Sequence, residues 1–157
     1  MVSNDSVICC VMNNKGNFLL VNQFRPNLQQ NTLEFPAGGV EHNEKNLDAA
    51  HREILEETGY KCDLIYLGSF RLLLNRTTNE EHLYFGLNPV KKNKYKLEEG
   101  IKIEEVTRKN FLKLVQSSKY FQLAGIGIIQ LASWNLKLDI LNESIKNIKK
   151  SFYEFQK

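Results

Sequence analysis

Acidic side chains at helical spacing are the part of this 157-residue sequence best suited to chemistry. Polar starting residues, two alanines and a closing glycine predict a helix from Asn43 to Gly59, on which Glu53, Glu56 and Glu57 share one arc. Like charges at this spacing destabilise a helix by about 0.2–0.5 kcal/mol per pair, so a compensating cation is expected. Mg²⁺ prefers carboxylate oxygen and takes substrate phosphates as further ligands. The alternative interpretation is a solvated acidic face without a ligand.

Further residues stand at fixed offsets from these glutamates. Gly38 opens the pattern, Glu44 follows after five residues, and Arg52 follows after seven more. The sequence then runs Arg-Glu-Ile-Leu-Glu-Glu-Thr-Gly-Tyr and closes at Gly59 and Tyr60. This stretch resembles the Nudix box, in which the position of Tyr60 usually carries an aliphatic residue. The resemblance implies a metal-dependent hydrolase of diphosphate linkages.

The resemblance also implies roles for the box residues. The implied metal ligands are three carboxylates and one backbone carbonyl, those of Glu53, Glu56, Glu57 and Ala37. The implied ion is Mg²⁺, with Mn²⁺ as the alternative. Such ions offset phosphate charge and lower the pKa of bound water. The glycines at 38 and 39 let the main chain approach an ion closely, while Glu44 and Arg52 have structural and orienting roles.

The box alone does not identify the general base. Nudix branches often place it on a glutamate in a downstream loop, which corresponds here to Glu98 or Glu99, and we favour Glu99. The neighbouring Gly100 supplies flexibility to such a loop. If this is an ordinary acidic loop, Glu53 or Glu56 becomes the expected base.

The stretch LLVNQFRPNLQQNTLEFPAGGVE indicates a substrate class. It resembles the ADP-ribose and nucleotide-sugar pyrophosphatase branch of the family. By this similarity Arg25 contacts a substrate phosphate, and Glu34 contacts the adjacent ribose or orients the site. Two features depart from the branch: the first expected strand starts at Val7 without a preceding strand-rich segment, and residues 70–76 contain no proline.

The expected reaction is therefore hydrolysis of ADP-ribose or a nucleotide sugar to a nucleoside monophosphate and a phosphorylated group. One alternative is a hydrolase of nucleoside triphosphates or dinucleoside polyphosphates. A second alternative, of a different class, is a non-catalytic Nudix module that binds a ligand or RNA. Such modules typically have eroded box glutamates, whereas this box is intact.

Composition bounds the cellular setting. The net charge of +3 is mild and lies mostly on late lysines, which weakly favours an anionic small molecule and makes nucleic acid an unexpected partner. No apolar run approaches a membrane span, and no signal peptide is visible. Three cysteines without framework spacing, Cys9, Cys10 and Cys62, indicate a reducing compartment, here the cytoplasm. A homodimer is a further expectation for the assembly of this chain.

The expected architecture is one α/β (α+β) domain over residues 1–157, with a mixed sheet between helices. Strands are predicted at residues 7–12, 18–24, 32–35, 64–70, 82–87 and 101–106. Residues 26–31 and 89–100 are predicted as loops, and residues 36–39 as a tight turn. Besides the box helix, a helix over residues 109–116 capped by Thr107 and one helical region from Ala124 to the end are predicted.

Overall fold

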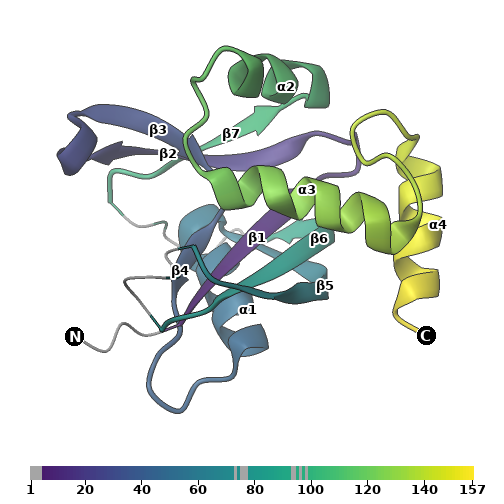
Figure 1. Ribbon diagram of the computed structural model, residues 1–157, viewed down its shortest axis with the longest axis horizontal. Helices are drawn as coiled ribbons and strands as arrows, with labels where there is room; N and C mark the ends of the chain where they lie inside the picture. The colour runs from purple at the N-terminus through teal and green to yellow at the C-terminus, as the bar shows by residue number, and fades with distance from the viewer. Residues whose placement is uncertain (1–4, 73, 75–77, 93–94, 96, 98) are drawn as a thin grey trace.

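The computed structural model describes residues 5–72, 74, 78–92, 95, 97 and 99–157, and Figure 1 shows its elements. The strands are β1 (Ser6–Met12), β2 (Phe18–Arg25), β3 (Gln30–Glu34), β4 (Ala37–Gly39), β5 (Tyr60–Phe70), β6 (Glu81–Lys91) and β7 (Lys102–Val106). The α-helices are α1 (Asn46–Thr58), α2 (Arg108–Gln116), α3 (Leu123–Leu136) and α4 (Ile145–Phe155), and a 3-10 turn, η1, spans Pro26–Leu28.

The strands form a mixed sheet whose main order is β3-β2-β1-β6-β5, with β4 paired to β1 and β7 paired to β2. β1 and β6 run parallel, and the other pairs are antiparallel. β1 pairs with β2 at its end, where Val11 faces Leu19, and with β4 at its start, where Ile8 faces Ala37. The strand that carries Ala37 is thereby fixed to the centre of the sheet.

The sheet separates two hydrophobic clusters because alternate side chains of a strand point to opposite faces. One cluster includes Cys10 and Phe18 and extends to residues of α2, α3 and α4, while the other includes Cys9 and Ile54 and lies under α1. Figure 1 shows α3 and α1 on opposite faces of the sheet. The predicted mixed sheet between helices is confirmed, and the adjacent residues Cys9 and Cys10 are buried on opposite faces of it.

The cysteines act as apolar core residues in this fold. Cys9, Cys10 and Cys62 are free thiols and all are buried. Burial raises the pKa of each thiol, to about 12 for Cys62. In the described ranges, no helix has the length and apolar character needed to cross a bilayer.

Two helix boundaries show how local sequence sets the elements. Thr107 caps α2 as predicted, since its hydroxyl accepts a hydrogen bond from the backbone N–H of Asn110 at 3.2 Å. Helix α1 begins at Asn46 rather than Asn43, because Asn43 has a φ of 64°, which a right-handed helix excludes. Tyr60 packs partly buried against the cluster under α1, as its position in the box requires.

The prediction of one continuous C-terminal helical region was wrong. α3 ends at Leu136, Lys137 is left-handed with a φ of 56°, and α4 begins after Ser144. Ser144 caps α4 by accepting from the N–H of Asn147. Side chains that favour turns thus interrupt the helical pattern.

Two predicted loops and one predicted turn also differ from the structure. Residues 89–91 continue β6, and residues 30–31 already belong to β3. Residues 37–39 form the strand β4 instead of a tight turn, and neither glycine in it has a positive φ. Gly38 therefore serves close packing against a neighbouring side chain rather than an unusual backbone conformation.

Candidate active site

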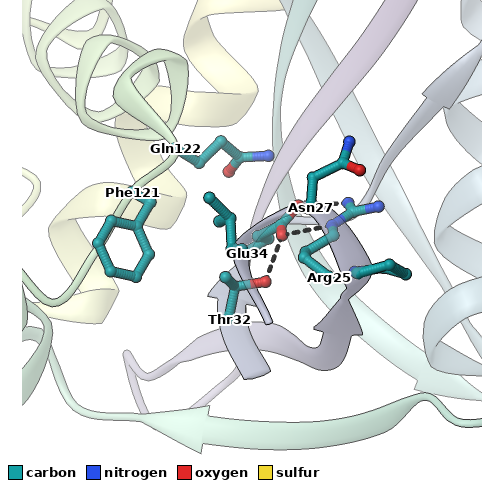
Figure 2. Close-up of a pocket in the computed structure, with 8 residues that line it drawn as sticks. Arg25, Asn27, Thr32, Glu34, Phe121 and Gln122 are labelled. Atoms are coloured by element: carbon teal, nitrogen blue, oxygen red, sulfur yellow. Dashed lines mark hydrogen bonds and ion pairs between the residues drawn. The ribbon is translucent and has the colours of Figure 1, made fainter. Parts of the chain in front are cut away.

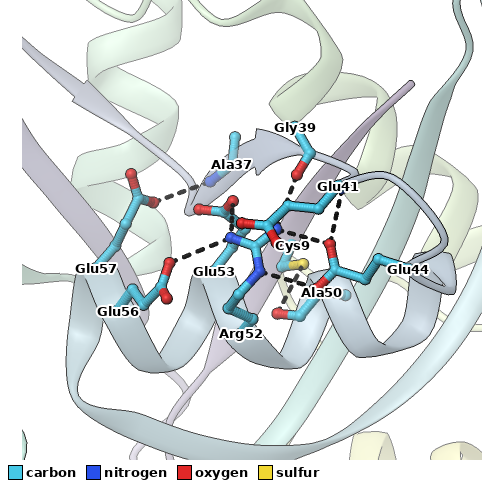
Figure 3. A network of polar contacts seen from close by, with 10 residues as sticks. All are labelled: Cys9, Ala37, Gly39, Glu41, Glu44, Ala50, Arg52, Glu53, Glu56 and Glu57. Atoms are coloured by element: carbon cyan, nitrogen blue, oxygen red, sulfur yellow. Dashed lines mark hydrogen bonds and ion pairs between the residues drawn. The ribbon is translucent and has the colours of Figure 1, made fainter. Parts of the chain in front are cut away.

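Helix α1 brings the acidic residues of the box to one side of β4 (Figure 3). Glu53 and Glu57 are only 8% and 6% exposed, whereas Glu56 is partly exposed. The helix ends at Gly59, whose φ of 71° lies in the left-handed region that favours glycine. The three glutamates lie on one arc, as their spacing predicts.

Arg52 contacts four acceptor groups at once. Its Nη1 atom lies 2.6 Å from Glu53 Oε1 and 3.2 Å from Glu56 Oε2. Its Nε and Nη2 atoms donate to the two oxygens of Glu44 at 2.9 and 2.8 Å, and Nη2 also donates to the carbonyl of Gly39 at 2.9 Å. The hydrogen bond with Glu44 is the main cause of a raised pKa at Arg52. The positive charge of Arg52 therefore offsets part of the repulsion between the box glutamates, for which the sequence predicts a bound cation.

Glu44 fixes Arg52 from the turn that precedes α1. Its carboxylate also accepts a hydrogen bond from the backbone N–H of Glu41 at 2.9 Å. The hydrogen bond from Arg52, followed by that from Glu41, lowers the pKa of Glu44 to about 2. Glu44 is therefore ionised at neutral pH and directed at Arg52, which agrees with an orienting role.

Strand β4 passes directly against the carboxylates of α1. The backbone N–H of Ala37 donates to Glu57 Oε2 at 3.0 Å. A Cβ atom at Gly38 would lie 2.1 Å from the carboxyl carbon of Glu53, so only glycine leaves room for this side chain. At Gly39 the same added atom would meet nothing within 4 Å. The structure thus brings Ala37, Glu53 and Glu57 together at one point of the main chain.

These groups suit a hard divalent cation in their chemistry, since carboxylate and carbonyl oxygens are the ligands that Mg²⁺ prefers. The space beside Gly38, which a Cβ would fill, holds the Glu53 carboxylate against the β4 main chain. In the described part of the chain, however, no group of three or more His, Cys, Asp or Glu side chains is arranged to hold a metal ion. The contacts of Glu56 with Arg52 and of Glu57 with Ala37 account for the present directions of two of these carboxylates.

Arg25 and Glu34, the predicted substrate-binding residues, form an ion pair in a neighbouring pocket (Figure 2). Arg25 donates from Nε and Nη2 to the two oxygens of Glu34 at 2.8 and 2.6 Å. The hydrogen bond with Glu34 is the main cause of a raised pKa at Arg25, and the charge of Glu57 contributes to it. Burial alone would raise the pKa of Glu34, but hydrogen bonds from Arg25 and Thr32 outweigh it and lower the value.

The loop expected to carry the general base is only partly described. Glu98 lies outside the described residues, while Glu99 is exposed beside Gly100, which has a φ of 84°. Lys92, the first residue after β6, donates its backbone N–H to the carbonyl of Gly59 at 2.8 Å. A side-chain carbon of Leu97 lies 3.4 Å from where a Cβ at Gly59 would stand. Lys92 and Leu97 therefore lie beside the end of α1 that carries Glu56 and Glu57.

Sequence reasoning missed the segment Tyr120–Gln122, which lies between α2 and α3. Phe121 and Gln122 line the same pocket as Arg25 and Glu34. The amide of Gln122 accepts from the N–H of Phe35 at 3.0 Å and donates to its carbonyl at 3.3 Å. The available signal was two aromatic residues and a glutamine placed directly before a helix that opens with small residues.

A family model described as the NUDIX domain matches residues 2–120. The chain belongs to the Nudix family. The ADP-ribose pyrophosphatase of Bacillus subtilis (strain 168) is 30% identical over 129 residues, which cover 80% of this chain and 70% of that protein. The methanol dehydrogenase activator of Bacillus methanolicus is 28% identical over the same length, with the same coverage of each chain.

A solved structure agrees with the fold of this Nudix protein. A crystal structure described as that of an ADP compounds hydrolase superposes with a TM-score of 0.75 at 16% identity, covering 87% of this chain and 75% of that chain. This likeness confirms the Nudix fold. Family membership and the intact box identify the chain as a pyrophosphohydrolase, while the roles of its individual site residues stay predictions.

Proposed function

We propose that this Nudix protein hydrolyses the diphosphate linkage of ADP-ribose or a nucleotide sugar and depends on Mg²⁺, with Mn²⁺ as the alternative ion. The products are a nucleoside monophosphate and a phosphorylated group. The observation that carries the proposal is the meeting of Glu53, Glu57 and the Ala37–Gly38 main chain at one point. The carboxylate oxygens of Glu53 and Glu57 are ligands of the kind that a hard cation prefers.

The metal-holding residues in this proposal are the predicted set, Ala37 through its carbonyl and Glu53, Glu56 and Glu57 through their carboxylates. A bound ion would offset the charge of the diphosphate and make water a better nucleophile. Arg52 holds Glu53 and Glu56 in place, and Glu44 holds Arg52 from the other side. Gly38 permits the approach of Glu53 to the main chain.

The remaining residues bind the substrate and move a proton. Arg25 contacts the substrate phosphate, and Glu34 orients Arg25 through their paired hydrogen bonds. Glu99, or Glu98 in the same loop, accepts a proton from the attacking water. The positions of Lys92 and Leu97 beside the end of α1 support that assignment. Glu53 or Glu56 is the base if the loop is not.

The substrate class is supported by the similarity to a protein named ADP-ribose pyrophosphatase and by the Glu-Phe-Pro-Ala-Gly sequence before the box. We propose a small-molecule nucleotide as the substrate, not a nucleic acid. We also propose a homodimer, for which analytical ultracentrifugation is the direct measurement.

A substrate panel tests the proposal. ADP-ribose, UDP-glucose, GDP-mannose and the nucleoside triphosphates are incubated with the enzyme in Mg²⁺, and phosphate release is read after coupling to a phosphatase. We expect turnover of ADP-ribose or a nucleotide sugar. Turnover confined to triphosphates would favour the hydrolase of nucleoside triphosphates or dinucleoside polyphosphates. Binding without cleavage of any compound would favour the non-catalytic module.

A further inference from the structure

The pocket beside the Arg25–Glu34 pair has almost no net charge. It is a cavity of about 490 Å³, a size usual for small-molecule sites, which occupy about 300–1,000 Å³. Its lining residues are Arg25, Pro26, Asn27, Leu28, Thr32, Glu34, Phe121 and Gln122. Among the described residues that line it, Arg25 and Glu34 are the only charged ones, and they neutralise each other. Apart from a phosphate at Arg25, this described lining offers nothing to balance the charge of a diphosphate, whereas a neutral nucleobase suits it.

Phe121 presents an aromatic ring to this pocket. The ring is 50% exposed and makes no aromatic contact with any other described residue. Figure 2 shows it on the side of the pocket away from Arg25. Aromatic rings on a pocket wall are the usual surface on which bases stack.

The backbone on both sides of Phe121 is fixed, although its ring is exposed. Tyr120 is buried, with its ring 4.8 Å from that of Phe111, and its hydroxyl donates to Gln122 Oε1 at 2.9 Å. Gln122 in turn binds both backbone groups of Phe35. The neighbours of Phe121 thus anchor its backbone, so less of the chain has to be ordered when a ligand packs against the ring.

Asn27 supplies a polar edge beside this surface. Its side-chain amide offers an NH2 donor group and a carbonyl acceptor, and it makes no hydrogen bond to any other residue in the described part of the chain. An amide of this kind can pair with adjacent acceptor and donor atoms on the edge of adenine. Gln122 cannot serve in this way because its amide is engaged by Phe35.

We propose that this pocket binds the base of the nucleotide substrate, with Phe121 as the stacking surface and Asn27 as the residue that reads the base. The proposal rests on the proposed function, since it assigns the neutral half of that substrate. Phe121 is then a residue that determines specificity and takes no part in the bond cleavage at the box.

Binding without metal tests the stacking role. The affinities of AMP and of ribose 5-phosphate, which lacks the base, are measured by calorimetry in the presence of a chelator. Wild-type protein should bind AMP at least tenfold more tightly than ribose 5-phosphate, and Phe121→Leu should weaken AMP binding by about tenfold. Phe121→Tyr keeps the ring and should bind AMP as wild type does.

Phe70→Leu is the matched control, because Phe70 is 45% exposed and lies outside this pocket. It should leave AMP binding unchanged. The proposal is overturned if wild-type protein binds AMP no better than ribose 5-phosphate, or if Phe121→Leu binds AMP as tightly as wild type. An equal loss in Phe70→Leu would also overturn it, since the effect would then be a general one.

The reading of the base is tested with AMP and IMP, since IMP carries a carbonyl where adenine carries an amino group. Wild type should prefer AMP by about tenfold, and Asn27→Ala should lose that preference. A preference that survives Asn27→Ala, or none in wild type, removes Asn27 from the proposal. Failure of the proposed hydrolysis can be told apart from failure of this binding proposal. In that case no substrate would be turned over, but AMP binding would still depend on Phe121.

Discussion

At the scale of single residues, Arg52 joins the acidic side chains of the site. Its guanidinium contacts Glu44, Glu53 and Glu56, and a planar fork of donors is suited to binding several carboxylates at once. A lysine has three donors on one nitrogen and does not reproduce this geometry. The box therefore specifies arginine at this position for the positioning of its neighbours.

Glu57→Gln tests the proposed metal site directly. The amide oxygen of glutamine can still accept the N–H of Ala37, so the β4 contact and the fold should survive. Loss of the charge should lower kcat by about two to four orders of magnitude, as removal of a central electrostatic group does. Steady-state kinetics and a thermal melt measure the two effects. An unfolded protein or full activity would contradict the site as described.

The pKa of Glu44 predicts an acid-dependent part of the stability. Because hydrogen bonds lower this pKa to about 2, the contribution is present above the ordinary value near 4.5 and is lost as pH falls toward 2. Thermal melts of wild type and Glu44→Gln should differ most above pH 5 and converge as the pH falls. A difference in Tm that stays constant with pH would show that Glu44 does not titrate in this way.

At the scale of elements, the contact between β4 and α1 predicts opposite outcomes for two adjacent glycines. Gly38→Ala places a Cβ about 2.1 Å from the Glu53 carboxyl carbon, so that side chain must move. Displacement of a catalytic group by about 1 Å can cost a hundredfold in rate, which is the loss of kcat expected here. Gly39→Ala is the control, since its Cβ meets nothing within 4 Å. Equal kcat values for the two variants would rule out this account.

The loop between β6 and β7 carries the prediction for the general base. Glu99→Gln, or Glu98→Gln, should lower kcat by about a hundredfold with little change in KM, because the group acts in the transition state. Full kinetics on each single variant and on the double variant separate the candidates. If all three keep near-normal kcat, the base lies elsewhere, with Glu53 or Glu56 next to be tested.

Local sequence predicts those helices and caps that depend on residues only a few positions apart. The box helix and the Thr107 cap were predicted because each depends on residues a few positions apart. The extension of β6 through Pro89 was missed because it depends on the partner strand. There β5 places one residue, Cys62, opposite Asn88 and Pro89, and such a bulge tolerates proline.

The site shows the same division between local and distant signals. The grouping of Glu53, Glu56 and Glu57 follows from helical periodicity alone. The place of Phe121 in the pocket depends on the contact of Gln122 with Phe35, which is 87 residues away in sequence. No periodicity in one segment reports a contact over that separation.

At the scale of the whole molecule, a metal that binds only the folded state should raise the melting temperature. At about ten times its dissociation constant, an ion should raise the Tm of a chain of this size by a few degrees. Thermal melts with a chelator, with Mg²⁺ and with Mn²⁺ measure this effect without any substrate. Glu57→Gln should show a smaller rise, and an equal rise in both proteins would place the bound ion elsewhere.

The central place of β1 in the sheet has a consequence for how the chain folds during synthesis. β1 can pair with β2 early, but its parallel partner β6 begins only at Glu81. Until that segment leaves the ribosome, the β1 edge from Ser6 to Val11 has no partner from β6, and unpaired edges promote association between chains. Parallel pairing between distant segments is also slow. Refolding yield should therefore fall as protein concentration rises, and nascent chains that end before β6 are the form most in need of a chaperone.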